Sequence, residues 1–315
     1  MALENSISNP GGAMSSRRHA LALLLGASRC LSGAANADAP VRLAISESVV
    51  GDVNLNDARA AMQIWIGRMT QDLNLVIDPK LLATTQEIVE LARRGQLDAA
   101  AMNILEYRLI SDLMDSSQIV NSAGADGFEQ YLILVKRNSG FGQLGDLKGG
   151  RLCTLKNPKM CAAPAWLSAI LAAGRHGPAQ RFFGSITSDT KLSRVVLPVF
   201  FGQAEASLTT RRGFDTMCEL NPQVARDLRV CVSSPALVVD FYIFRKNYQS
   251  AYREKVIKAI SNLHSSVAGR QIATLFQFHE LTVRDGSCLA SALAVLEAAD
   301  RARGRGAQDA GKDRP

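Results

Sequence analysis

The chain has 315 residues, of which 47% are hydrophobic and 21% charged, so it is long enough for two globular domains and too apolar for a disordered polymer. Much of its formal net charge of +7 lies in the first 37 and the last fifteen residues. The nearly balanced body shows no stacked-aromatic or zinc-finger pattern, so we expect no nucleic-acid partner. No stretch after residue 37 is apolar for ~18 residues, which excludes a membrane-spanning helix there.

Residues 1–37 have the pattern of a signal peptide. Two arginines at positions 17 and 18 precede an apolar stretch at 20–27, and an Ala-x-Ala cleavage site ends at Ala37. We therefore expect export to the periplasm with cleavage near Ala37. Twin-arginine export and a plain disordered N-terminus are the alternatives. The poor fit of residues 1–13 to the pattern also leaves Met14 open as the true start of translation.

Helix and strand patterns alternate along the chain. The first half predicts strands at 41–45, 75–77, 97–102 and 128–135, with helices from 56, from a Thr84/Glu87 capping box to Gly95, and after 103. The second half predicts strands at 151–155, 204–209, 228–232 and 238–244, and helices at 163–173, 188–202, 214–220, 252–264, 268–276 and 289–301. This order predicts an α/β fold with parallel strands and right-handed crossovers.

One strand-like block occurs twice. Gly-Gln-Leu-Asp-Ala-Ala-Ala-Met at 95–102 is echoed by Gly-Gln-Ala-Glu-Ala-Ser-Leu-Thr at 202–209. Each block carries a run of small apolar residues that suits a parallel strand buried on both faces. The echo predicts two α/β lobes with a cleft between them. Because the helices after residue 244 have no sheet of their own, we expect lobe one to comprise 38–135 plus 242–300, lobe two to comprise 136–241, and a disordered tail at 301–315.

Four phrases resemble the type II periplasmic solute-binding proteins, in the phosphate, phosphite and phosphonate branch of the ABC-transporter receptors. They are Val-Arg-Leu-Ala-Ile-Ser at 41–46, Tyr-Leu-Ile-Leu-Val-Lys-Arg at 131–137, Gly-Asp-Leu-Lys-Gly-Gly-Arg-Leu at 145–152 and Val-Leu-Pro-Val-Phe-Phe-Gly-Gln-Ala-Glu-Ala at 196–206. The resemblance implies two mixed sheets flanked by helices and joined by two crossover strands. It also implies that the lobes close on a small, anionic ligand beyond the carboxyl ends of the strands and deliver it to a membrane permease or a sensor protein.

The chain departs from this family at one functional segment. Phosphonate-binding relatives carry Ser-Thr-Ser after the first strand of lobe two, whereas this chain has Asn-Pro-Lys-Met-Cys-Ala-Ala at 157–163, without a hydroxyl. Backbone amides of the following helix and Lys156 or Lys159 remain available to an anion. A carboxylate, another oxyanion or an amphiphilic organic ligand reaching Met160 are therefore alternatives to a phosphonate.

Candidate ligand-binding residues lie where strands end. Glu106 favours a ligand with an amine or hydroxyl donor, while Arg211 suits a carboxylate or phosphate, or is a solvated arginine beside Arg212. The full set is Ser46, Ser48, Thr85, Asn103, Glu106, Tyr107, Tyr131, Lys156, Met160, Cys161, Thr209, Thr210, Arg211 and Asp240.

The sequence offers little for catalysis or metal binding. Its four histidines are scattered, no nucleophile motif or P-loop is present, and no cysteine spacing suits zinc, so we expect neither enzyme activity nor a cofactor. Cys218 and Cys231 flank a turn and are candidates for a disulfide, with unpaired buried thiols as the alternative. We expect a monomeric binding protein. The alternatives are a ligand-binding module that feeds a periplasmic sensor kinase or cyclase, an enzyme on the same fold, and the effector domain of a transcription regulator.

Overall fold

The architecture is that of a computed structural model, which describes all residues except 1–39, 51–52, 75, 249–251, 277 and 313–315. The predicted signal peptide lies outside the described residues. Residues 37–315 form a single compact unit built on two separate sheets.

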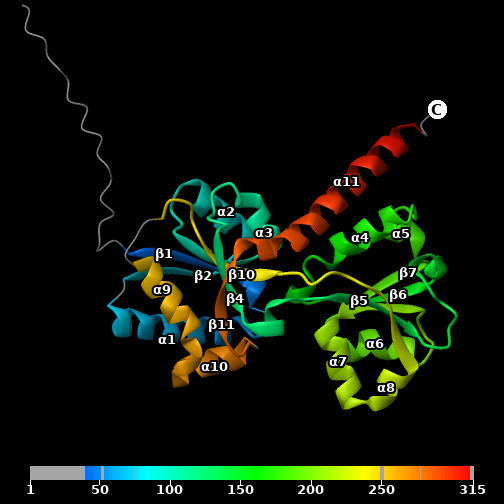
Figure 1. The fold of residues 1–315 in the computed structure, drawn as a ribbon, viewed down its shortest axis with the longest axis horizontal. Helices are drawn as coiled ribbons and strands as arrows, with labels where there is room; N and C mark the ends of the chain where they lie inside the picture. Colours follow the sequence, from blue (N-terminus) through cyan, green and yellow to red (C-terminus); the bar gives the residue numbers. More distant parts are fainter. Residues whose placement is uncertain (1–39, 51–52, 75, 249–251, 277, 313–315) are drawn as a thin grey trace, which may run out of the picture. The chain divides into compact units, whose positions relative to one another are not determined.

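The first sheet is assembled from both ends of this unit (Figure 1). Its strand order is β11-β4-β10-β3-β1-β2. β1 pairs in parallel with β2 and β3, whereas β10 runs antiparallel to β3 and β4. The strands are β1 (Val41–Ser46), β2 (Ile77–Ala83), β3 (Ala99–Asn103), β4 (Gln118–Ser122), β10 (Asp240–Phe244) and β11 (Leu281–Asp285).

Helices cover both faces of the first sheet. On one face lie α1 (Leu55–Leu73) and α9 (Tyr252–Ser261), whose buried apolar side chains share a cluster with those of β1. α10 (Val267–Leu275) packs against α1. On the other face lie α2 (Thr85–Arg93), α3 (Ile104–Ile110) and α11 (Ala290–Lys312).

The second sheet lies within the middle of the sequence and has the order β7-β6-β8-β5-β9. Its strands are β5 (Tyr131–Lys136), β6 (Arg151–Leu155), β7 (Ser185–Asp189), β8 (Ala206–Thr210) and β9 (Leu228–Ser233). One face packs against α4 (Ala163–Ala173) and α5 (Ala179–Phe182), and the other against α6 (Leu192–Phe200), α7 (Arg211–Leu220) and α8 (Pro222–Asp227). The predicted fold class, two mixed sheets flanked by helices, is confirmed.

Two neighbouring stretches of chain connect the sheets. Glu129 and Leu237 exchange a pair of backbone hydrogen bonds of 2.8 Å between these stretches. The Ser234 side chain accepts from the backbone N–H of Tyr131 at 2.8 Å. A third link is α11, which packs against α4. We refer to the two connecting stretches, residues 128–130 and 234–239, as the hinge.

Several predicted boundaries were wrong. Residues 131–135 were assigned to lobe one, but β5 pairs with β8 and β9 and so belongs to the second sheet. The strand expected at 75–77 instead begins at Ile77. Strands β4, β7 and β11 were not predicted, because β7 is mostly exposed and polar residues keep the apolar runs of β4 and β11 short. The tail expected to be disordered from 301 continues α11 to Lys312, and ion pairs of Glu297 with Arg301 and Asp300 with Arg303 support that helix.

The repeated block has a structural counterpart in each lobe. Gly95 and Gly202 both take the left-handed conformation, with φ of 66° and 73°, which lets the chain turn from a helix into a strand. The acidic residue of each block binds an arginine on the parallel strand next to the block, which is β1 in the first lobe and β6 in the second. Asp98 accepts from the backbone and guanidinium of Arg42, and Glu205 accepts in the same way from Arg151. Each block therefore fixes a strand to its parallel neighbour.

Candidate functional site

Five predicted site residues meet at the carboxyl ends of β1, β2 and β3. Glu106 is 2% exposed, and its carboxylate accepts hydrogen bonds from the hydroxyls of Ser46 at 2.6 Å and Ser48 at 2.8 Å. Thr85 donates a further hydroxyl bond at 2.9 Å, and the backbone N–H of Asn103 donates at 2.9 Å. The donors that were expected to hold a ligand are thus occupied by a carboxylate of the protein itself.

The position of Glu106 follows from its helix. The Asn103 side chain caps α3 by accepting from the N–H groups of residues 105 and 106, and Glu106 completes the reciprocal capping box. An acidic group in the first helical turn is also favoured by the helix dipole. The carboxylate therefore takes the place that an oxyanion would have at this helix N-terminus.

A tyrosine occupies the corresponding place in the second lobe. Tyr131 is fully buried, and its hydroxyl donates to the backbone carbonyl of Lys159 at 2.9 Å and accepts from the N–H of Ala162 at 3.3 Å. Ala162 is the N-cap of α4. Tyr131 thus contacts the segment that lacks hydroxyls, and its contact with a ligand stays a prediction.

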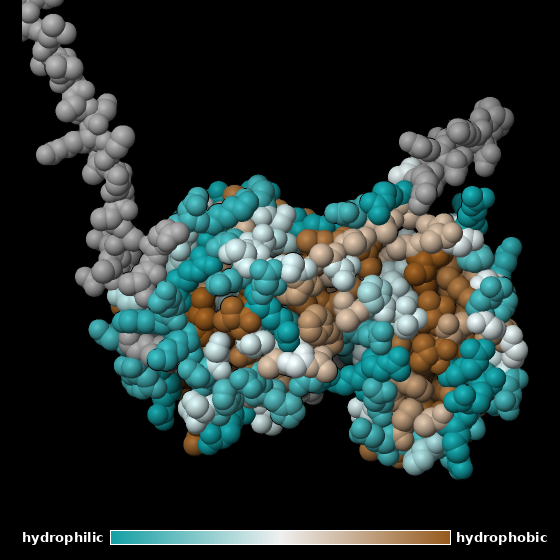
Figure 2. Space-filling model, in the orientation of Figure 1, coloured by the Kyte–Doolittle hydropathy of each residue, from teal (hydrophilic) through white to brown (hydrophobic). Residues whose placement is uncertain are grey.

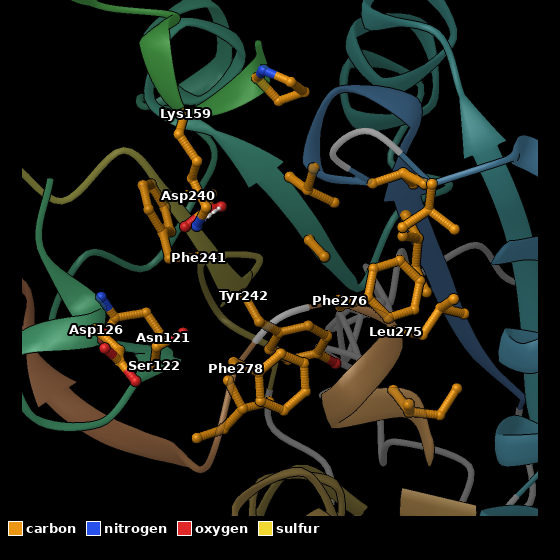
Figure 3. A pocket seen from close by; sticks show the side chains of 18 of the residues that line it. Asn121, Ser122, Asp126, Lys159, Asp240, Phe241, Tyr242, Leu275, Phe276 and Phe278 are labelled. Carbon is orange, nitrogen blue, oxygen red and sulfur yellow. Dashed lines mark hydrogen bonds and ion pairs between the residues drawn. The ribbon is translucent and has the colours of Figure 1, made fainter. Parts of the chain in front are cut away.

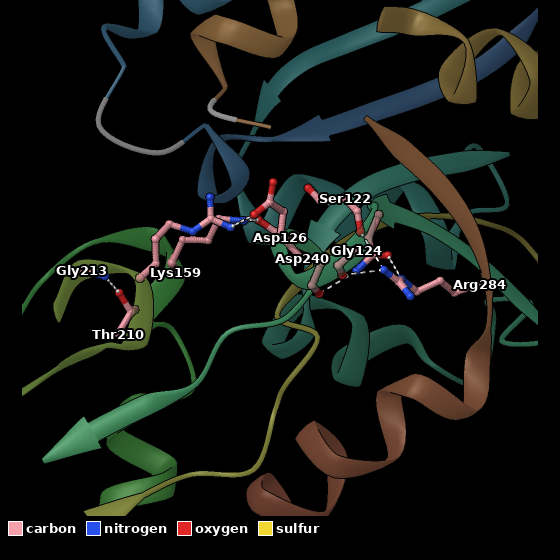
Figure 4. A network of polar contacts seen from close by, with 11 residues as sticks. Ser122, Gly124, Asp126, Lys159, Thr210, Gly213, Asp240 and Arg284 are labelled. Atoms are coloured by element: carbon pink, nitrogen blue, oxygen red, sulfur yellow. Dashed lines mark hydrogen bonds and ion pairs between the residues drawn. The ribbon is translucent and has the colours of Figure 1, made fainter. Parts of the chain in front are cut away.

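Charged side chains of both lobes meet across the space between the sheets (Figure 4). Lys159, in the turn before α4, pairs with Asp240 of β10 at 2.6 Å. Arg212 of α7 pairs with Asp126, which precedes the hinge, at 2.7 Å. In both pairs the cation belongs to the second lobe and the carboxylate to the first.

Glu129 lies at the hinge beside these pairs. Its side chain is buried, and among the described residues its carboxyl group has no hydrogen-bond partner. Burial raises the pKa of Glu129 to about 7, although Lys159 and Arg212 act in the opposite direction. Asp240 and Asp126 add to the increase. This carboxyl group consequently changes charge near neutral pH.

A cavity of about 600 Å³ opens among these groups. Its polar end is lined by Asp126, Glu129, Lys159, Arg212 and Asp240, and it continues into apolar side chains between the first sheet and its α1, α9 and α10 helices (Figure 3). The volume lies in the range of small-molecule sites, ~300–1,000 Å³. The cavity is therefore the ligand site that the geometry favours.

The other predicted residues have varied surroundings. Of the predicted set, Thr210 and Asp240 line the cavity, and the Thr210 hydroxyl accepts from the N–H of Gly213 to cap α7. Arg211 donates to the side chain of Gln130 at 3.2 Å. Tyr107 is buried edge-on against Phe241.

The remainder lie outside the cavity lining. Lys156 is exposed and Met160 and Thr209 are buried. Cys161 is largely enclosed, and burial raises the pKa of its thiol to about 12.

The predicted disulfide is absent, since Cys218 and Cys231 are both free thiols. Cys218 packs into the apolar cluster on the α7 side of the second sheet, whereas Cys231 packs into the cluster on the α4 side. The two side chains thus face opposite sides of β9 and cannot meet.

Sequence reasoning missed three cavity residues, Asp126, Glu129 and Arg212. Asp126 and Glu129 are an acidic pair just before a strong strand, which was the available signal. Nothing local marks Arg212, because its partner lies 86 positions away.

Among the described residues, no group of three histidine, cysteine or acidic side chains is arranged to hold a metal ion. The helices in the same part of the chain are all too short or too polar to cross a bilayer.

Solved structures share this arrangement of two lobes. XAC2383 from Xanthomonas citri bound to ATP matches with a TM-score of 0.60 at 13% identity, over 84% of this chain and 98% of that one. PhnD1 from Prochlorococcus marinus in complex with methylphosphonate matches with a TM-score of 0.55 at 12% identity, over 82% and 98%. A binding protein component of an ABC phosphonate transporter from Pseudomonas aeruginosa, PA3383, matches with a TM-score of 0.50 at 13% identity, over 87% and 99%.

The fold shared with these structures is two-lobed, with a cavity beside the hinge. No curated protein is significantly similar in sequence. A family model does match residues 49–287, and it describes the ABC transporter phosphonate periplasmic substrate-binding proteins. The chain belongs to this family, which confirms the predicted resemblance.

Proposed function

We propose that this chain is exported through residues 1–37 and captures a small anionic solute between its lobes as a monomer, without catalysis. Hinge closure would then present the loaded protein to the permease of an ABC transporter. The family supports this role, and the hinge beside Glu129 and Leu237 supports the motion.

The two ion pairs across the cleft carry the proposal for the ligand's charge. Lys159 and Arg212 are held by carboxylates of the opposite lobe at 2.6 Å and 2.7 Å. Their side chains are 38% and 48% exposed, so an entering anion can replace Asp240 or Asp126 as the partner. The Ser46, Ser48 and Thr85 hydroxyls do not serve this anion, because Glu106 already accepts from them.

A thermal-shift and calorimetric screen tests the proposal with phosphate, methylphosphonate, alkyl sulfonates and carboxylates. A ligand at a hundredfold excess over its Kd stabilises the folded protein by about 2.7 kcal/mol. Lys159→Gln and Arg212→Gln should each weaken the best anion at least about tenfold, since each removes a charge-assisted contact. Lys156→Gln is the matched control, because Lys156 is exposed and lies outside the cavity lining. Failure of every anion to bind, or unchanged binding to Lys159→Gln, would refute an anionic ligand.

A further inference from the structure

The cavity has two chemically different ends. Lys159, Asp240 and Asp126 lie together at one end, whereas Tyr242, Phe276 and Phe278 lie at the other (Figure 3). The apolar end is also lined by α1, through Met62, Trp65 and Met69. Apolar side chains also reach the surface in the part of the chain built on the first sheet (Figure 2).

The apolar end is larger than binding a small oxyanion requires. Phosphate or methylphosphonate would fill the charged end alone and leave the space between β1, β3, α1 and α9 unoccupied. Water is a poor occupant there, because a buried water needs two to four polar partners. The Tyr242 hydroxyl is buried in this wall with no hydrogen-bond partner among the described residues.

We propose that the solute is an amphiphile, with an anionic head between Lys159 and Arg212. Its apolar chain or ring lies in the apolar end of the cavity, between the first sheet and the helices α1, α9 and α10. This inference rests on the proposed anion-binding function for the head, whereas the tail rests on the cavity alone. The two ends then select for a molecule in which charge and apolar surface are separated.

Three molecules separate the contributions of head and tail. Methylphosphonate carries the head, 1-octanol carries the tail, and n-octylphosphonate carries both. Each buried methylene should tighten binding by about fourfold. Octylphosphonate should therefore bind at least on the order of a hundredfold more tightly than methylphosphonate, even when only part of the chain is buried.

Ala101→Phe blocks the tail space without touching the charged end. Ala101 lies on β3 opposite Tyr242, lines the cavity and is only half-buried, so a larger side chain extends into the open volume. Ala60→Phe is the matched control, because Ala60 is exposed on α1 and outside the lining. Ala101→Leu provides a smaller block if circular dichroism shows that Ala101→Phe is misfolded.

We expect Ala101→Phe to reduce octylphosphonate affinity to that of methylphosphonate and to abolish octanol binding, while Ala60→Phe leaves both unchanged. Equal affinity of the wild type for methyl- and octylphosphonate, with no octanol binding, would overturn the amphiphile. Octylphosphonate binding that is unchanged in a folded Ala101 variant would overturn it as well. Octanol binding without binding of either phosphonate would instead support the tail site and refute the anionic head.

Discussion

Replacing Glu106 tests whether this carboxylate substitutes for a ligand anion. It is buried and accepts hydrogen bonds from three hydroxyls and from the N–H of Asn103, at 2.6 to 2.9 Å. Glu106→Ala removes every acceptor at once. Glu106→Gln keeps the shape, and the Ser46 and Thr85 hydroxyls can reverse to accept from the new amide, while the second oxygen position still serves Asn103.

The two variants should therefore differ in stability. A hydrogen bond to a charged group contributes about 1.5–3 kcal/mol, but part of the gain is offset by desolvation of the carboxylate. We expect Glu106→Ala to lower the free energy of unfolding by about 3–5 kcal/mol, and Glu106→Gln by about 1–2 kcal/mol. At about 2 °C per kcal/mol for a chain of this size, the alanine variant should melt roughly 6–10 °C below the wild type.

Formate or phosphate should then rescue the alanine variant. The anion would accept the same hydroxyl and amide hydrogen bonds, and at a tenfold excess over its Kd it would restore about 1.4 kcal/mol. Differential scanning calorimetry, with and without the anion, measures this gain at constant ionic strength. Chloride at equal concentration controls for general salt effects.

Two results would refute the reasoning. An alanine variant as stable as the wild type would show that the four hydrogen bonds add nothing to folding. Stabilisation of the wild type and Glu106→Ala to the same extent by formate would show that the anion binds elsewhere.

Two further predictions concern the hinge and the start of α4. Burial raises the pKa of Glu129 to about 7, so the folded state binds a proton on this carboxyl group more strongly than the unfolded state does. The protonated group therefore contributes stability that is fully present below pH ~4.5 and is lost as the pH rises through 7. Glu129→Gln should remove this loss and stabilise the protein by about 3 kcal/mol relative to the wild type at pH 8. If urea unfolding gives the same stability difference between variant and wild type at pH 5 and at pH 8, the raised pKa of Glu129 is contradicted. Tyr131→Phe deprives the Lys159 carbonyl and the Ala162 N–H of a buried partner, and should cost about 1–3 kcal/mol; an unchanged melting temperature would disprove this role.

The sequence predicted the elements whose burial is continuous. The apolar runs of β1, β3 and β5 are buried on both faces, and pattern alone identifies such strands. Strand β7 is largely exposed, and the apolar part of β4 is only Ile119 and Val120 between polar residues, so neither sequence carries such a run. The sheet to which β5 belongs was also not predictable, since pairing partners are set by the whole fold and not by the strand's own residues.

The polar residues at strand ends were found, but their partners were not. Strand order explains why Ser46, Thr85 and Asn103 lie together, because parallel strands end at the same edge of a sheet. The spacing of Asn103 and Glu106 is the same capping-box signature as that of Thr84 and Glu87. It implies that the Glu106 carboxylate turns back toward Asn103 and the neighbouring hydroxyls. Sequence reasoning applied that signature once and missed its second occurrence.

The repeated block leads to a last prediction, because its two acidic residues make the same contacts in different surroundings. The side chain of Asp98 is 6% exposed and lies near both Arg42 and Arg245, whereas that of Glu205 is 28% exposed and binds Arg151 alone. Asp98→Asn should therefore lower the free energy of unfolding by about 2–3 kcal/mol, and Glu205→Gln by less than about 1 kcal/mol. Raising the salt concentration should shrink the smaller effect and leave the larger one nearly intact, since exposed pairs are screened more strongly. Equal losses of unfolding free energy for the two variants in urea would mean that burial does not set the strength of these contacts.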